Sequence, residues 1–144
     1  AGKLPPPRET VYAASKFALE GWTEGLREEV RAFGIGVTAV EPGFFRTELL
    51  VEGASTIWPE LSIDDYAAET ATTIEAWKGM NGKHSGDPAK LAANLVKVAE
   101  LEPSPARWAV GADAVQGITH KGEVLIEQAQ ALLELSTGLD VVGG

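Results

Sequence analysis

The sequence predicts a helix-rich α/β fold that contains part of a parallel sheet. Three observations predict it: long amphipathic segments dominate the chain, two short apolar runs lie between them, and the run 35–40 is nearly all apolar rather than alternating. A strand of that kind is typical of a parallel sheet covered by helices on both faces. Because two short strands make only a marginal sheet, we expect the strand at 35–40 to need further neighbours.

The first 50 residues predict a loop, a helix and a strand. Three consecutive prolines at 5–7 favour the loop. The helix is predicted over Tyr12–Phe33, and Gly34 ends it. The strand 35–40 follows and is closed by Pro42-Gly43. Apolar residues at spacings of three and four predict a buried stripe on the helix, made of Leu19, Trp22, Leu26, Val30 and Phe33.

The rest of the chain alternates loops and helices. Residues 44–61 show no periodicity but carry many apolar side chains, so they predict a flap or a groove wall. Four elements are then predicted in order: a helix over about Ile63–Lys78 that Ser62 can cap, a helix that begins at Asp87-Pro88, a short strand at Arg107–Val110, and a last helix from about Gly111 to Leu135.

Composition narrows the class of protein. The 144 residues are 44% hydrophobic and 23% charged, which suits one globular unit. No apolar run is long enough to span a bilayer, and the first residues lack the apolar centre of a signal peptide. Cysteine is absent, which excludes thiolate metal sites and is compatible with the cytoplasm, where we expect the protein to lie. The net charge of -9 disfavours nucleic acid and anionic membranes as partners.

The most informative pattern is Tyr12-Ala-Ala-Ser-Lys16, at the start of the first predicted helix. Side chains four residues apart share one helical face. A cation beside a phenol favours the phenolate, and the helix N-terminus adds partial positive charge in the same direction. Tyr12 and Lys16 can therefore act together as a general acid or base for an alcohol or a carbonyl. Taken alone, the spacing favours a tyrosine that merely packs against a lysine stem.

A second motif lies at the end of the predicted strand, in the run Glu41-Pro-Gly-Phe-Phe-Arg-Thr47. A Y-x-x-S-K sequence that opens a helix, followed by a strand ending in P-G-x-x-x-T, resembles the second half of a classical short-chain dehydrogenase/reductase. Residues 12–50 carry nearly all of the likeness. The resemblance implies a Rossmann-like, doubly wound parallel sheet. Residues 1–144 would be the C-terminal portion of that single domain, without its N-terminal cofactor-binding half.

The resemblance also implies an activity. The protein would be an NAD(P)-dependent oxidoreductase that interconverts an alcohol and a ketone or aldehyde by hydride transfer, with NADP or NAD as cofactor. Tyr12 would be the catalytic acid or base. Lys16 would activate Tyr12 and bind the nicotinamide ribose. The substrate would be a small-molecule alcohol or carbonyl compound, and the full-length enzyme a homodimer or homotetramer.

Four further residues are implied to bind the cofactor, in addition to Tyr12 and Lys16. Pro42 and Gly43 would form the turn beside the nicotinamide, where a glycine lets the ring approach the backbone closely. The backbone amide of Phe45 would bind the carboxamide. Thr47 would contact the same region, although a cap for the residues that follow is about as plausible.

The likeness leaves two alternatives open. The serine and the glycine-rich turn of the family are not found in these residues, so we expect the isolated polypeptide to be inactive. A sugar-nucleotide epimerase or dehydratase shares the Y-x-x-x-K motif and the fold. A non-catalytic dimerisation module would keep only the face of the first helix, which is a common oligomer interface in the family.

Other candidate residues have simpler interpretations. His84 and His120 lie far apart without metal-ligand spacing, so we interpret both as solvated surface residues and expect no metal site. Asp64-Asp65 is explained by favourable charge at a helix start rather than by a metal. Trp58 lies in the predicted flap, where contact with a medium or large apolar substrate is as probable as simple packing.

Overall fold

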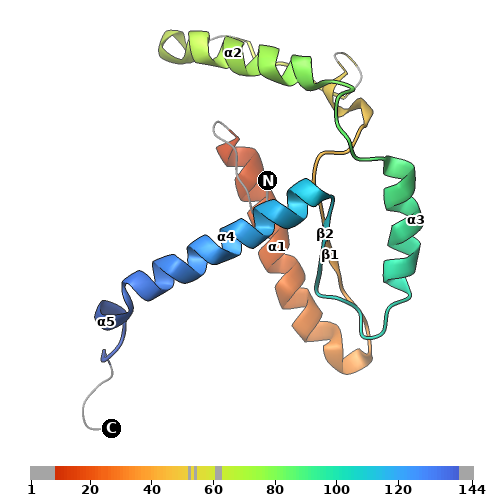
Figure 1. The fold of residues 1–144 in the computed structure, drawn as a ribbon, viewed down its shortest axis with the longest axis vertical. Coiled ribbons are helices and arrows are strands. Elements are labelled where there is room, and N and C mark those ends of the chain that lie inside the picture. Colours follow the sequence, from red (N-terminus) through yellow and green to blue (C-terminus); the bar gives the residue numbers. More distant parts are fainter. Residues whose placement is uncertain (1–8, 52, 54, 61–62, 140–144) are drawn as a thin grey trace.

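The computed structural model describes residues 9–51, 53, 55–60 and 63–139. Figure 1 shows long helices around a short pair of strands, so the predicted helix-rich α/β class is confirmed. The elements in order are α1 (Thr10–Val30), the 3-10 turn η1 (Arg31–Phe33), β1 (Ala39–Pro42), the 3-10 turn η2 (Glu48–Leu50), α2 (Asp64–Met80), α3 (Pro88–Ala99), β2 (Arg107–Val110), α4 (Ala112–Ala131) and α5 (Leu133–Ser136).

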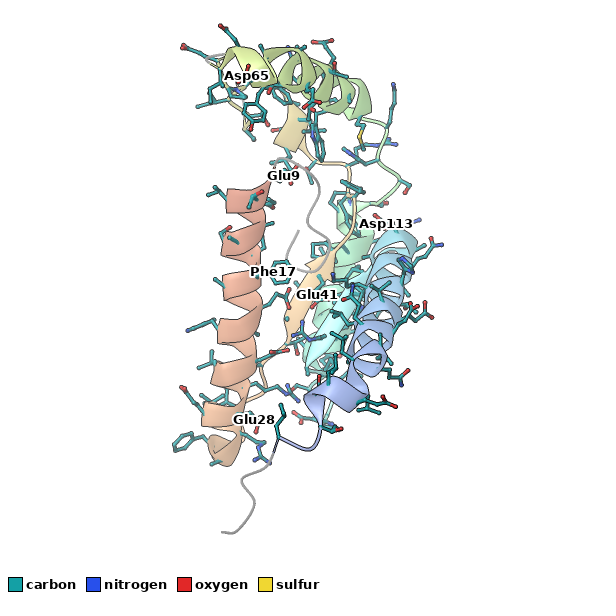
Figure 2. The ribbon with its side chains drawn as sticks, turned by 90° about the vertical axis from the view of Figure 1, so that its left-hand side faces the viewer. Glu9, Phe17, Glu28, Glu41, Asp65 and Asp113 are labelled. Carbon is teal, nitrogen blue, oxygen red and sulfur yellow. The ribbon has the colours of Figure 1, made fainter. Side chains whose placement is uncertain are left out.

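The two strands pair in parallel, with Ala39 opposite Arg107 and Pro42 opposite Val110. Helices α2 and α3 lie in the connection between them, as a parallel pair requires. Both strands therefore end at the same edge, and Figure 2 shows Glu9, before α1, and Asp113, on α4, towards that end of the molecule. This edge is where open α/β folds bind ligands.

Two arginines attach α1 to the strand region. Arg27 donates hydrogen bonds to the carbonyl oxygens of Val37, at 2.5 Å, and Ser104, at 2.8 Å. Arg107 of β2 forms ion pairs with Glu20 and Glu24 of α1 and with Glu41 of β1. These contacts hold the helix at a defined position against both strands.

The charges of this cluster shift each other's protonation. Burial raises the pKa of Glu41, and the neighbouring Glu20 adds to the increase, although the hydrogen bond from Arg107 opposes it. Burial alone would lower the pKa of Arg107. Its hydrogen bonds to the three glutamates outweigh that effect and raise the pKa.

The predicted buried stripe of the first helix is largely wrong. Trp22 is 63% exposed and Phe33 78% exposed, and Leu19 is exposed as well. Among the described residues, only Ala13 of α1, at 4% exposed, and Ala114 of α4, at 7%, are buried. The spacing correctly identifies an apolar face, but burial also needs an element that covers this face, and the described elements leave most of it open.

The predicted boundaries are correct in kind but shifted. The strand predicted at 35–40 begins only at Ala39, because the carbonyl of Val37 is bonded by Arg27 rather than by β2. The first helix tightens into a 3-10 turn before Gly34, whose φ of 70° confirms the predicted stop. The last predicted helix is interrupted at Leu132 between α4 and α5.

Two helix starts follow the predicted local chemistry. Asp87 caps α3, its carboxylate accepting a hydrogen bond from the amide of Ala89 at 2.9 Å. The first turn of α2 carries Asp64 and Asp65, which confirms the interpretation as helix-start charge. The predicted cap Ser62 lies outside the described residues. None of the helices described in the structure combines the length and apolarity that crossing a bilayer demands.

Candidate active site

Tyr12 and Lys16 lie together on the first turns of α1, as predicted. The Lys16 ammonium is 5.3 Å from the centroid of the Tyr12 ring, within the range of a cation–π contact. The Tyr12 side chain is 52% exposed. Ser15 donates a hydrogen bond back to the Tyr12 carbonyl at 2.6 Å, so its hydroxyl faces its own helix. The phenol is therefore accessible from outside the chain, with a cation at its side.

The turn after β1 is held by backbone hydrogen bonds. The amide of Gly43 donates to Val110 at 2.8 Å, and that of Arg46 to Gly86 at 2.9 Å. Gly86 in turn donates to the carbonyl of Phe44 at 3.2 Å. These bonds fix the chain beyond the strand end on both sides of Phe45. Within the part of the chain that the structure describes, the Phe45 amide has no such acceptor.

A residue that the sequence pattern did not suggest completes this turn. The carboxylate of Asp113, on the first turn of α4, accepts a hydrogen bond from the amide of Phe44 at 2.8 Å. A Cβ added to Gly43 would collide with this carboxylate. The close approach to Gly43 in this structure is thus made by the Asp113 carboxylate, and approach of the nicotinamide ring to the same turn stays a prediction. The sequence signal that could have identified Asp113 is an acidic residue that closely follows Gly111, the glycine after β2.

Thr47 has the predicted capping role. Its Oγ1 accepts a hydrogen bond from the amide of Leu49 at 3.3 Å, at the start of η2. Thr47 is itself exposed. Its hydroxyl proton can still be donated, so contact with a cofactor remains a prediction.

An aromatic group covers the outer side of the turn. The rings of Phe44 and His84 are stacked with centroids 5.5 Å apart, and Trp77 of α2 lies 6.3 Å from Phe44. The prediction of a solvated His84 is wrong, because the residue is half-buried in this stack. Its Nε2 is buried and has no hydrogen-bond partner among the residues that the structure describes. His120 is exposed as predicted, 3.9 Å from Glu123.

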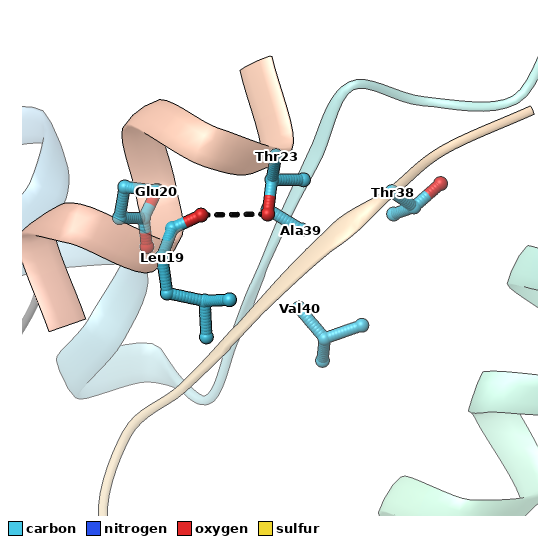
Figure 3. Close-up of a pocket in the computed structure, with 6 residues that line it drawn as sticks. All are labelled: Leu19, Glu20, Thr23, Thr38, Ala39 and Val40. Atoms are coloured by element: carbon cyan, nitrogen blue, oxygen red, sulfur yellow. Dashed lines mark hydrogen bonds between the residues drawn. The ribbon is translucent and has the colours of Figure 1, made fainter. Parts of the chain in front are cut away.

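Two open pockets lie on the described surface. One, of about 230 Å³, lies between the segment before α2 and α2 itself, and is lined by Trp58, Pro59, Thr70, Thr73, Ile74 and Trp77. Trp58 lines this pocket, and its ring contacts the Lys78 ammonium. Its Nε1 is buried and has no hydrogen-bond partner among the described residues. The other, of about 170 Å³, lies where α1 meets β1 (Figure 3) and is bordered by Thr23, whose hydroxyl bonds the Leu19 carbonyl. Among the described residues, no three His, Cys, Asp or Glu side chains are grouped to hold a metal ion.

Comparison with known proteins finds a family match over the part of the chain that contains Tyr12, Lys16 and the turn after β1. A family model described as short chain dehydrogenase matches residues 1–57. The oxidoreductase BOA17 of Botryotinia fuckeliana is 33% identical over 94% of this chain and 48% of its own length. The 3beta-hydroxysteroid dehydrogenase dhs-16 of Caenorhabditis elegans is 37% identical over 56% of this chain and 24% of its own.

A solved structure extends the likeness to the whole fold. The crystal structure of a short-chain dehydrogenase from Streptomyces avermitilis superposes with a TM-score of 0.74 and 36% identity, over 96% of this chain and 48% of the other. The described elements are therefore a Rossmann-like α/β arrangement. The chain spans about half the length of the relatives that it matches over nearly all its residues.

Proposed function

Because the chain belongs to the short-chain dehydrogenase/reductase family, we propose that it supplies the acid–base residues of an NAD(P)-dependent oxidoreductase. The intact protein that carries this chain interconverts an alcohol and a ketone or aldehyde. The observation that carries the proposal is the accessible Tyr12 phenol with the Lys16 ammonium 5.3 Å from its ring centroid, at the start of α1.

The proposed role of Tyr12 is proton transfer to or from the substrate oxygen. During reduction its hydroxyl gives a proton to the carbonyl oxygen, and during oxidation the phenolate takes the alcohol proton. Lys16 places its positive charge beside the Tyr12 ring, where it stabilises negative charge that develops during the reaction, and it binds the nicotinamide ribose. The nicotinamide, when bound, supplies or accepts the hydride.

The strand-end turn fits the remaining cofactor contacts. The amides of Gly43, Phe44 and Arg46 already have acceptors within the chain, whereas that of Phe45 has none among the described residues. A free amide in a turn whose neighbours are fixed suits a carboxamide oxygen. We propose that Pro42, Gly43 and Phe45 bind the nicotinamide end of NADP or NAD, with Thr47 beside them.

Replacing the phenol tests the proposal. In the intact protein, Tyr12→Phe is expected to lower kcat by about 10²–10⁴-fold while leaving the melting temperature unchanged, because the hydroxyl is accessible and general acid–base catalysis is of that size. The matched control is Tyr66→Phe, at an exposed position on α2 and the only other tyrosine of the chain. Full activity of Tyr12→Phe, or an equal loss in both variants, would refute the proposal.

We further propose that the 144-residue chain alone is inactive. Its two short strands and its scarcity of buried side chains among the described residues support this. Fluorescence titration of the isolated chain with NADPH and NADH is expected to give no saturable binding. Micromolar binding would contradict this part of the proposal without affecting the role of Tyr12.

The pocket at Trp58 supports an apolar substrate. Its walls combine Trp58, Ile74 and Trp77 with two threonines, a largely apolar lining of the kind that binds apolar ligands. A relative named as a 3beta-hydroxysteroid dehydrogenase fits this class of alcohol. Trp58→Ala is expected to lower kcat/KM for lipophilic alcohols by about tenfold, with the exposed Leu95 of α3 changed to Ala as control. An unchanged kcat/KM would remove Trp58 from the substrate site.

The exposed apolar face of α1 supports a homodimer or homotetramer of the intact protein. Leu19 and Trp22, three residues apart on one face of α1, are both exposed in the single chain, and exposed apolar surface of this kind commonly marks an interface. Light scattering of the intact protein after size exclusion measures its mass directly. A monomer at micromolar concentration would exclude this state.

A further inference from the structure

Asp113 joins two segments that lie far apart in sequence. It belongs to the first turn of α4, immediately beyond β2, yet its Oδ2 accepts a hydrogen bond from the amide of Phe44, 69 residues earlier. The contact crosses the shared edge of the two strands, just where β1 ends at Pro42. A bond from a backbone amide to a carboxylate is stronger than one between neutral groups.

The Asp113 carboxylate lies between two glycines, Gly43 and Gly111, whose lack of a side chain leaves room for it. A Cβ on Gly43 would collide with the Asp113 carboxylate, and a Cβ on Gly111 would lie 2.6 Å from its Oδ1. Gly111 also has a φ of 102°, which side-chain-bearing residues rarely adopt. Each strand is thus followed by a glycine at the place where Asp113 fits between them.

A simpler interpretation is that Asp113 merely provides negative charge at the start of α4. The structure favours a more specific role, because α4 has no side-chain cap and the resolved bond of this carboxylate goes to another segment. That bond fixes Phe44, whose neighbour Phe45 carries the amide assigned above to the nicotinamide carboxamide. The carboxylate therefore acts on the turn rather than on its own helix.

We infer that Asp113 is a positioning residue that holds the Gly43–Phe45 turn in the conformation that binds the cofactor. The expected effect on cofactor binding rests on the proposed function, but the contact between Asp113 and Phe44 can be tested separately. Asp113 touches neither the substrate nor the reacting atoms in this assignment. It acts through the backbone of Phe44.

The test compares two changes of Asp113 in the intact protein. Asp113→Ala removes the acceptor and is expected to weaken NADH or NADPH binding about tenfold, the loss expected from one charge-assisted hydrogen bond. Asp113→Asn keeps an acceptor oxygen and is expected to stay within about twofold of wild type. Asp64→Ala, the same change in the first turn of α2, is the control and is expected to bind like wild type.

Hydrogen exchange of the Phe44 amide supplies the second measurement. Exchange is expected to accelerate in Asp113→Ala and to stay slow in Asp113→Asn. Wild-type cofactor affinity in Asp113→Ala, or equal losses in the Ala and Asn variants, would overturn the inference. If the wild-type protein binds neither nucleotide, the proposed function fails, and unchanged Phe44 exchange in Asp113→Ala would then independently refute the positioning role.

A double-mutant cycle sharpens the assignment. Gly43→Ala places a Cβ against the carboxylate and is expected to displace it, so the single variant should weaken cofactor binding. In the Asp113→Ala background, the added methyl group meets no carboxylate, and the further loss should be less than twofold. Simple additivity of the two losses would show that Gly43 and Asp113 do not act together.

Discussion

The two ends of the parallel strand pair differ in how they employ polar side chains. At the end where the strands begin, Arg27 donates to the carbonyls of Val37 and Ser104, and Thr38 donates to that of Pro105 at 2.7 Å. At the end where the strands finish, Tyr12 stays half-exposed beside Lys16. The first set of side chains is satisfied within the chain, and the second faces outward.

The difference separates stability from chemistry along one short sheet. Side chains that satisfy buried carbonyls stabilise the fold and leave little capacity for ligands. Tyr12, at the finishing end, keeps accessible atoms. The turn at that end is held by backbone hydrogen bonds and by Asp113. Substitutions at the beginning end should therefore alter the free energy of unfolding, and those at the finishing end should alter activity.

The largest expected effect lies at the finishing end. Lys16→Met removes the charge beside Tyr12 and is expected to lower kcat about a hundredfold. Lys97→Met, on the surface of α3, is the control. If Lys16→Met lost much stability but kept a normal kcat, the claim that the finishing end of the strands serves activity rather than stability would be wrong.

The next largest effect concerns the ion-pair cluster around Arg107, which joins α1 to both strands. Arg107→Met leaves Glu41, whose side chain is 8% exposed, facing Glu20 without a cation. Because the Arg107 side chain is itself 29% exposed, the free energy of unfolding should fall by about 2 kcal/mol, less than for a fully buried pair. Arg31→Met removes a surface pair with Glu28 and should cost no more than about 0.5 kcal/mol. Urea unfolding measures both. Equal costs would mean that burial of this cluster does not matter.

A pair of glycine substitutions gives a smaller effect of opposite sign. Gly34→Ala forces a side chain into the left-handed conformation that ends η1 and should destabilise the fold by about 1 kcal/mol. Gly21→Ala lies inside α1 with open space around it and should stabilise by about 0.5–1 kcal/mol. Thermal unfolding of the two variants checks the signs. Stabilisation by Gly34→Ala would show that the turn does not require a positive φ.

The smallest effect is a change in how stability depends on pH. Burial, with help from Glu20, raises the pKa of Glu41 above its ordinary value of 4.5. An acid whose pKa is higher in the folded state contributes stability that is fully present below its unfolded pKa, and loses it as pH rises through the folded value. Glu41→Gln does not titrate, so its stability should fall less than that of wild type as pH increases above 4.5. Parallel curves from urea unfolding at each pH would contradict the raised pKa.

Local chemistry explains which parts were predictable. The helix stop at Gly34, the cap at Asp87 and the shared face of Tyr12 and Lys16 all depend on residues within one turn of each other. The boundary of β1 was predicted less well. Its start depends on where Ala39 meets β2, whose pairing residues lie far along the chain.

The sequence by itself determined the helices, the parallel arrangement of the strands, and the shared helix face of Tyr12 and Lys16. These features depend on side-chain spacing and on the glycines and prolines that end elements, which act over a few residues. Only the tertiary structure decided that Asp113 supports Phe44 and that Arg107 joins Glu20, across 69 and 87 residues respectively. It also decided that Trp22 is exposed. Spacing shows which residues are apolar or charged, whereas contact and burial depend on which distant segment the folded chain brings against them.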